Sequence, residues 1–249
     1  MSRRPIVLVH GAWGGAWIWR RVLASLRAAG HEVHAVTLTG DGDRAHLHHP
    51  GIKLGDHVAD VVTAVQAEEL RQIVLVGHSY GGMVITGAAD RLLQVDPQAV
   101  GALVYVDAMV PLPGEGWGEQ HSAEVSAART ASAQANDHAL PPPDPVDFGI
   151  TGADREWLLR RQVPHPFGPY RDPLHFDAAR WSALPRTFID CTQPPYPTIA
   201  AMRERVRHMP GFEVVELVTG HCPMVTEPAA LVRLLLRAAG GAPMSAALT

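Results

Sequence analysis

The sequence is short of cysteine and of charged residues, and it has no excess of basic ones. Only Cys191 and Cys222 are present among 249 residues, which excludes a disulfide scaffold and any CxxC zinc or iron–sulfur site. The 21 basic residues do not outnumber the 25 acidic ones, so nucleic-acid binding has no electrostatic support. No apolar run is long enough for a membrane span, and no signal peptide is recognisable. These shortages predict a cytoplasmic protein with reduced thiols that binds neither nucleic acid nor membranes.

Apolar material, in contrast, is abundant. Hydrophobic residues make up 47% of the chain and charged residues 18%, which excludes a disordered adaptor. The length suits a single α/β domain, and a formal net charge of −4 favours small or neutral partners. A homodimer is left open. The 23 glycines and 21 prolines are many for a compact chain, and their positions need an explanation.

Short β-rich runs alternate with stretches of helical period along most of the chain. The expected strands are 6–9, 32–37, 72–76, 102–106, 187–189 and 212–217. The expected helices are 17–29, 58–70, 82–93, 199–208 and 228–239. Strand–helix alternation predicts a mostly parallel six-stranded sheet with helices on both faces.

The alternation breaks between residues 110 and 185, where prolines cluster among helical fragments such as 122–134 and 154–162. A structureless connection of this length is improbable in a compact domain, so we expect a helical cap (lid) inserted over one sheet edge. The predicted division is a core of residues 1–109 and 186–249 and a cap of residues 110–185. A surface decoration without a role at the site is the alternative.

The strongest chemical signal is the G-x-S-x-G sequence at 77–81, directly after an expected strand and before an expected helix. Such a sharp turn holds its serine in a strained backbone conformation and lifts the hydroxyl clear of the helix N-terminus. Ser79 is therefore the candidate nucleophile. The alternative is a serine that only caps the helix.

A serine hydroxyl needs a base, and histidine has the suitable pKa. His221 follows the last expected strand, which places it at the same sheet edge as Ser79, so we assign it this role. His78 is expected to pack beside the nucleophile. His46, His48 and His49 lie in a polar loop without the carboxylate or cysteine spacing of a metal site, and no metal or cofactor is expected.

An acyl transfer also needs two donors for the oxyanion of the tetrahedral intermediate. One is expected from the backbone N–H of Tyr80, the residue after the nucleophile. The other is expected from the glycine-rich loop after the first strand, where Ala12 is our choice. A plain glycine-rich turn is the alternative for this loop.

Several of these segments resemble those of a known family. The segments 10–17 (HGAWGGAW), 29–31 (AGH), 77–82 (GHSYGG) and 221–224 (HCPM) resemble the α/β-hydrolase fold, and within it the plant methylesterase and hydroxynitrile lyase group with its bacterial esterase relatives. The resemblance covers nearly the whole chain and weakens across the cap. It implies a Ser–His–acid triad, carboxylic-ester hydrolysis and no cofactor.

The sequence departs from this group in two ways. Hydroxynitrile lyases of the group have Thr in place of Gly11 and Lys in place of Cys222, so cyanohydrin chemistry is disfavoured. The family usually places its acid a few residues past the strand at 187–189, where residues 191–195 (CTQPP) contain no carboxylate. Asp107, at the end of the strand 102–106, and Asp190, in the later strand, both keep the chain order. We favour Asp107, because a strand-end carboxylate can face the histidine without distorting the strand.

The resulting prediction is a serine hydrolase that cleaves a small to medium, largely apolar carboxylic ester or lactone through an acyl-enzyme. Ser79, His221 and Asp107 are the expected catalytic residues, and Ala12 and Tyr80 the expected oxyanion donors. Five aromatic residues of the cap are candidates for the pocket lining: Trp117, Phe148, Trp157, Phe167 and Trp181. A lyase or cyclase that uses Ser79 and His221 for acid–base work, motivated by the displaced acid, and a non-enzymatic ligand-binding protein are the alternatives.

Overall fold

The fold is built on one parallel sheet of six strands in the computed structural model, which describes residues 3–240. The strand order is β2-β1-β3-β4-β7-β8, and every neighbouring pair is parallel. The strands are β1 (Ile6–Val9), β2 (Val33–Val36), β3 (Ile73–His78), β4 (Val100–Val106), β7 (Arg186–Cys191) and β8 (Phe212–Leu217). All six expected strands are confirmed, with bounds that differ by a few residues.

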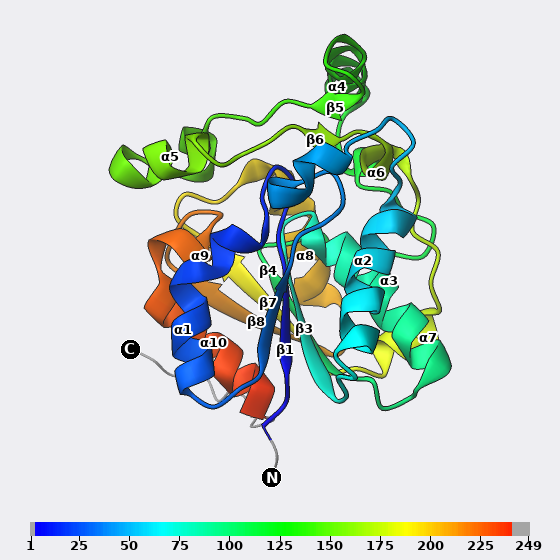
Figure 1. Cartoon of the computed structure of the whole chain (residues 1–249), viewed down its shortest axis with the longest axis vertical. Coiled ribbons are helices and arrows are strands. Elements are labelled where there is room, and N and C mark those ends of the chain that lie inside the picture. The colour runs from blue at the N-terminus through cyan, green and yellow to red at the C-terminus, as the bar shows by residue number, and fades with distance from the viewer. Residues whose placement is uncertain (1–2, 241–249) are drawn as a thin grey trace.

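Helices cover both faces of the sheet. Helices α1 and α10 pack together on one face, and α2 and α3 pack together on the other (Figure 1). The core helices are α1 (Arg20–Ala28), α2 (Leu54–Ala67), α3 (Gly81–Val95), α8 (Ala200–His208), α9 (Pro223–Thr226) and α10 (Pro228–Gly240). The α/β-hydrolase fold class predicted from the sequence is confirmed. The last nine residues of the predicted core, 241–249, lie outside the described residues.

The central strands are apolar because both of their faces are covered. Every residue of β1 and β3 is buried, which is the burial expected for strands inside a doubly covered parallel sheet. The edge strand β8 is only partly buried along most of its length. The core therefore lies along the middle of the sheet and fixes the position of the strand ends.

The register of the central strands brings the candidate residues to one edge. The N–H of Ser79 donates to the carbonyl oxygen of Val106 at 3.2 Å, and the N–H of Asp107 donates to that of Ile189 at 2.8 Å. Ser79 thus follows β3 and Asp107 follows β4 at neighbouring positions. Parallel strands expose the loops after their carboxyl ends on a single side of the sheet, which is where ligand sites of this architecture form.

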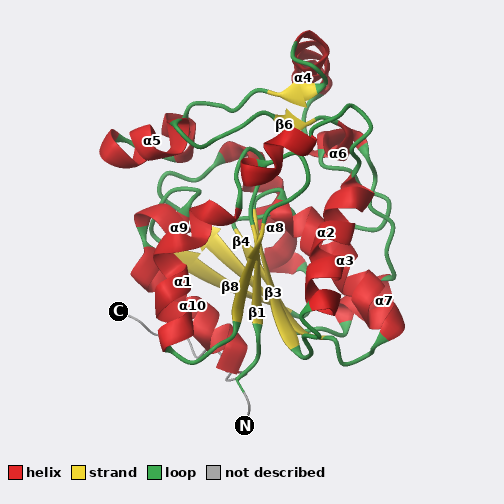
Figure 2. Cartoon of the chain, in the orientation of Figure 1, coloured by secondary structure: helices red, strands yellow, loops and turns green. Residues whose placement is uncertain are grey.

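The long segment between β4 and β7 rises over this edge, as Figure 2 shows. Its elements are η3 (Gly118–Gln120), α4 (Ala123–Ala135), β5 (Ala139–Leu140), η4 (Pro145–Phe148), α5 (Gly152–Leu159), β6 (His165–Pro166), α6 (Gly168–Arg171) and α7 (Ala178–Ser182). The short strands β5 and β6 pair antiparallel beside α4, whereas α7 packs against α3 beside the sheet. The boundaries at 110 and 185 stay a prediction.

Across residues 3–240, no helix combines the length and the hydrophobicity needed to cross a bilayer.

Candidate active site

Ser79 occupies a sharp turn between β3 and α3. Its φ is +53°, in the left-handed region that a residue with a side chain adopts only under constraint. The neighbouring glycines make the turn sterically feasible. A Cβ on Gly77 would lie 2.6 Å from the carbonyl oxygen of Gly81, and a Cβ on Gly81 would lie 2.7 Å from that of His10. The strained turn expected from the sequence is present.

A continuous row of hydrogen bonds joins Ser79, His221 and Asp107. The Ser79 hydroxyl lies 2.9 Å from Nε2 of His221, and Nδ1 of His221 lies 2.7 Å from Oδ2 of Asp107. An Nδ1–H that donates to the carboxylate leaves Nε2 free to accept the serine proton. The imidazole and the carboxylate are buried, so little water competes for these bonds. The arrangement is that of a nucleophile, a base and an orienting acid.

The second oxygen of Asp107 is held by an arginine that our sequence analysis missed. Nη2 of Arg203 donates to Oδ1 of Asp107 at 2.7 Å, while Nε of the same guanidinium donates to Oδ1 of Asp190 at 2.6 Å. Arg207 binds the other oxygen of Asp190 at 2.7 Å. The two candidate acids therefore have different surroundings: Asp107 contacts the histidine, and Asp190 contacts the arginines.

The position of Arg203 in the sequence resembles that of a residue packed in the core. It lies on α8 between Ile199 and Val206, at the spacing of the buried helix face. A charged residue at such a position is almost never fully buried unless it is paired. The sequence alone does not show which residues pair with Arg203, because its two partners come from β7 and from the turn after β4.

His78 packs beneath the reacting histidine, as expected. Its Nε2–H donates to the carbonyl oxygen of His221 at 2.8 Å, and the two rings lie 4.7 Å apart. Burial holds the pKa of His78 well below its ordinary value, so the ring is neutral at pH 7. From the other side, the N–H of His221 donates to the carbonyl oxygen of Phe148 at 3.2 Å. His221 is therefore held by the core and by the segment above it.

Both expected oxyanion donors lie at the same edge of the sheet as Ser79. Ala12 lines the same small cavity as Ser79, in the loop after β1. The Tyr80 side chain turns away from that cavity, and its hydroxyl donates to Nδ1 of His57 at 2.9 Å. Within residues 3–240, the backbone N–H groups of Ala12 and Tyr80 donate to no protein acceptor. Both amides are thus available to an oxyanion on a substrate.

The cavity at Ser79 is almost closed. Its volume is about 20 Å³, and its walls include Phe148, Leu158 and Gln162 from the segment above the sheet. About 10–15 Å³ is what a single water molecule needs on this measure. The free space beside the hydroxyl is therefore close to that of one water molecule.

Among the five aromatic residues expected around the pocket, only Phe148 lines the cavity at Ser79. Trp117 packs on the Tyr80 ring at 5.2 Å, Trp157 packs on Trp17, and Phe167 stacks on Tyr170. The expectation for Trp181 was wrong. Its indole N–H donates to the Tyr105 hydroxyl at 2.9 Å, and α7 carries it to the side of α3, away from the reacting edge.

A buried cluster has the spacing of a metal site. Ligand atoms of Asp41, His57 and His165 lie within 4.8 Å of one another. Nδ1 of His165 pairs with Asp41 at 2.8 Å, whereas Nε2 of His165 has no partner within the described residues. His57 donates to the carbonyl oxygen of Thr39 and accepts from the Tyr80 hydroxyl. Burial raises the pKa of Asp41 to about 7 and lowers those of His57 and His165 to about 4 and about 3. We interpret the cluster as a buried polar network.

The loop histidines His46, His48 and His49 do not join a ligand cluster of this kind within the described residues. His48 instead hydrogen-bonds the carbonyl oxygen of Asp137 at 2.8 Å. Cys191 and Cys222 are both free and buried. Burial raises the pKa of each thiol, so neither supplies a thiolate for chemistry at neutral pH.

The chain belongs to the alpha/beta hydrolase family, whose model matches residues 6–234. This is the class that the six-stranded sheet and the serine turn define.

Particular relatives narrow the resemblance. The chain is 38% identical to the carbendazim hydrolyzing esterase of Nocardioides sp. (strain SG-4G), over 92% of this chain and 97% of that protein. It is 28% identical to methylesterase 3 of Arabidopsis thaliana, over 95% of this chain and 96% of that one. Among solved structures, an extracellular alpha/beta-hydrolase from a Paenibacillus species superposes with a TM-score of 0.81 at 23% identity, covering 95% of this chain and 99% of that one.

Proposed function

We propose that this protein is a serine carboxylesterase in which Ser79, His221 and Asp107 act as the catalytic triad. The observation that carries the proposal is the unbroken row of hydrogen bonds from the Ser79 hydroxyl through His221 to Asp107. Relatives named as an esterase and as a methylesterase, which match over most of their length, support ester hydrolysis as the reaction.

The chemistry follows from the positions of these groups. As Oγ of Ser79 forms a bond to the acyl carbon of the substrate, Nε2 of His221 takes the hydroxyl proton. The amides of Ala12 and Tyr80 bind the oxyanion that develops on the carbonyl oxygen. The protonated histidine then gives its proton to the alkoxide oxygen that leaves as an alcohol. Water, deprotonated by the same histidine, attacks the acyl-enzyme and releases the acid and the serine.

Asp107 holds the tautomer of His221 that this sequence of proton transfers needs, and it stabilises the imidazolium that forms. Its own position is set by Arg203, which binds the oxygen that does not face the histidine. The acid displaced from its usual family position was the reason to consider a lyase or cyclase. Because a carboxylate lies 2.7 Å from Nδ1 of His221, that reason no longer applies, and hydrolysis is the better reading.

We also propose that residues 110–185 act as a cap over the site. Phe148 and Leu158, from this segment, line the cavity that holds Ser79, which a mere surface decoration would not do. The apolar character of these walls supports a small to medium, largely apolar ester or lactone as substrate. We also propose a cytoplasmic location, because two free, buried cysteines suit a reducing compartment.

The test is a rapid-mixing experiment with p-nitrophenyl butyrate, combined with fluorophosphonate labelling. We expect a burst of p-nitrophenol equal to the enzyme concentration wherever deacylation is slow, and one fluorophosphonate per chain on Ser79. Both should disappear in Ser79→Ala and persist in Ser25→Ala, a control at an exposed serine on α1. Turnover that survives Ser79→Ala would refute the acyl-enzyme proposal, and an unlabelled Ser79 would favour a binding protein.

A further inference from the structure

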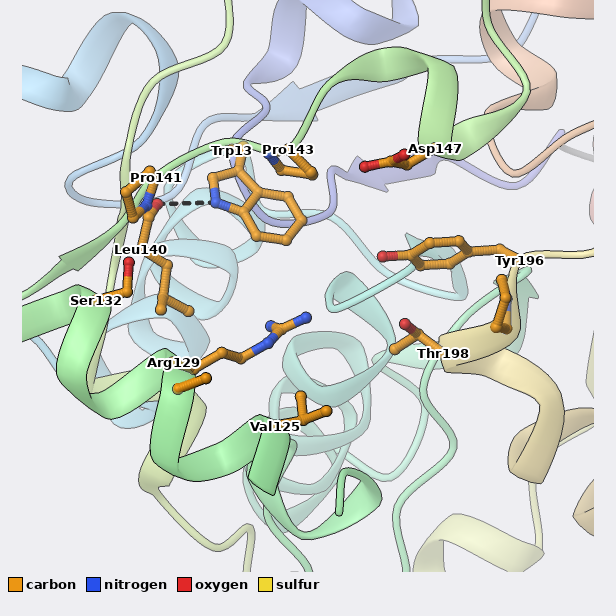
Figure 3. Close-up of a pocket in the computed structure, with 12 residues that line it drawn as sticks. Trp13, Val125, Arg129, Ser132, Leu140, Pro141, Pro143, Asp147, Tyr196 and Thr198 are labelled. Atoms are coloured by element: carbon orange, nitrogen blue, oxygen red, sulfur yellow. Dashed lines mark hydrogen bonds between the residues drawn. The ribbon is translucent and has the colours of Figure 1, made fainter. Parts of the chain in front are cut away.

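A second, much larger cavity lies beside the closed one. Its volume is about 650 Å³, and it lies between α4 and the chain around η4 and η5 (Pro197–Ile199) (Figure 3). Its walls are mostly apolar and include Trp13, Leu140 and Pro143. A space of this size takes a ligand considerably larger than water.

The large cavity adjoins the reacting groups. Trp13, from the loop after β1, lines both cavities and so forms part of the wall between them. Tyr196, from the opposite wall, lies with its ring 4.3 Å from the imidazole of His221. The large cavity therefore lies next to the groups that would bind the ester.

One charged side chain enters the large cavity from α4. The guanidinium of Arg129 points into it, between Trp13 and Thr198, as Figure 3 shows. Its central carbon lies 5.4 Å from the Trp117 ring centre and 5.2 Å from that of Tyr170, so two aromatic rings hold it in place. This leaves the polar edge of the guanidinium directed into the cavity.

The charge of Arg129 is not balanced by the protein. Its Nη1 is buried without a hydrogen-bond partner in the part of the chain that the structure describes. Asp147 lines the same cavity but lies across it (Figure 3). Burial and then the charge of Arg129 lower the pKa of His121 to about 4, so the positive charge is felt by its surroundings. A buried donor without a partner is costly, and an anion bound there would remove the cost.

We propose that the large cavity binds the end of the substrate remote from the ester and that Arg129 recognises a carboxylate on it. The substrate class is then a half-ester: a carboxylic ester whose acyl part has an apolar chain and ends in a free carboxylate. The planar guanidinium presents paired N–H donors that match a carboxylate, and the apolar walls accommodate the chain between the two ends. This inference rests on the proposed esterase function and specifies its substrate.

The kinetic test compares monomethyl esters of linear dicarboxylic acids, from succinic to sebacic, with methyl esters of the corresponding monocarboxylic acids. In the wild type, kcat/KM should favour at least one half-ester over its neutral counterpart by about tenfold or more. Arg129→Met, which keeps the apolar stem, should remove that preference mainly through KM, with a much larger loss on the half-ester than on its neutral counterpart. Arg129→Lys should retain part of the preference.

The control is Arg171→Met, since Arg171 also lies over a cap aromatic ring, Phe167, but does not line the cavity. It should leave the preference intact. Equal losses on both ester series in Arg129→Met, or no half-ester preference in the wild type, would overturn the inference while leaving the esterase proposal standing.

A binding measurement separates the two proposals. Calorimetry with Ser79→Ala should detect the preferred half-ester, and the double variant Ser79→Ala/Arg129→Met should bind it at least about tenfold more weakly. Equal binding by the two variants would refute the role of Arg129 even in a protein that hydrolysed no ester. Arg129-dependent binding without any turnover by the wild type would instead refute the esterase proposal and support the anion site.

Discussion

Two polar regions at the top of the sheet differ in how they are satisfied. Along the sheet edge, an unbroken row of hydrogen bonds joins Ser79, His221 and Asp107. The row continues from Asp107 to Arg203 and ends at Asp190. In the neighbouring large cavity, the guanidinium of Arg129 lies over two aromatic rings, and its Nη1 has no hydrogen-bond partner among residues 3–240. The polar groups of the first region satisfy one another, whereas Nη1 of Arg129 in the second is unsatisfied within the described residues.

This difference indicates a division of labour. Chemistry that must be repeated identically at each turnover depends on groups held by the rigid sheet, where a small displacement is costly. On the two proposals above, the cap selects the substrate, and the Arg129 guanidinium in the cap is satisfied by the ligand that binds. Substitutions in the row should therefore lower kcat or stability, and substitutions in the cap should change KM and preference.

The largest effect should come from Asp107→Asn. The amide removes the negative charge and favours the wrong tautomer of His221, so kcat on p-nitrophenyl butyrate should fall about ten-thousand-fold. Asp190→Asn, at the neighbouring strand end, should lower kcat by less than about tenfold, because Asp190 contacts Arg203 and Arg207 and not the histidine. If Asp190→Asn is the more impaired variant, the assignment of the acid is wrong.

Arg203→Met tests how far the row depends on its buried cation. Removing the Arg203 guanidinium leaves buried Asp107 without a cationic partner and Asp190 with Arg207 alone. The free energy of unfolding should therefore fall by about 3–5 kcal/mol in urea titrations. Adding Asp190→Asn should recover part of this loss. Arg71→Met, at an exposed ion pair with Asp96, is the control and should cost less than about 1 kcal/mol. If Arg203→Met lowered the free energy of unfolding by as little as Arg71→Met does, Arg203 would not contribute to stability through its two carboxylates.

Acidification should destabilise the fold through buried histidines outside the row. Burial lowers the pKa of His57 to about 4, so between pH 6.5 and pH 4 the unfolded chain binds a proton there that the folded chain does not. Stability therefore falls with pH over this range, and His57 alone accounts for about 2 kcal/mol by pH 5. The raised pKa of Asp41, about 7 and due first to burial, opposes this because folded Asp41 takes up a proton as pH falls.

The measurement is the free energy of unfolding at pH 7 and pH 5. His57→Gln should show a smaller difference between the two values than the wild type, whereas His208→Gln, at an exposed position, should show the wild-type difference. An unchanged difference in His57→Gln would contradict the assignment of this loss to His57.

The smallest effect is expected in the cap. Phe148→Leu thins the wall between the serine cavity and the Tyr196 ring, which lies 5.3 Å from Phe148. The relative kcat/KM for longer acyl chains should rise by about two- to fivefold, with little change for acetate, in a series of p-nitrophenyl esters. Phe176→Leu, which removes the same ring where it packs on Trp181, should leave the series unchanged. Equal shifts in both variants would mean that the cap acts through stability and not through the site.

Much of the architecture was predictable because local patterns specify it. Strands such as β1 and β3 are apolar throughout since both faces are covered, and the glycines around Ser79 are there because a Cβ would meet backbone atoms. The position of His221 after the last strand likewise follows from chain order. These features depend on neighbours in the sequence or on the general geometry of parallel sheets.

The sequence by itself thus determined the fold class, the serine turn and the edge at which the candidate histidine lies. Chain order left Asp107 and Asp190 as candidate acids and favoured Asp107, which follows β4, over Asp190, which lies within β7. Only the tertiary structure shows that Asp107 contacts His221 while Asp190 contacts the arginines. It also placed Trp181 beside α3 and directed Arg129 into a cavity. Such contacts join residues far apart in the chain, and no local pattern of hydrophobicity or turn residues encodes them.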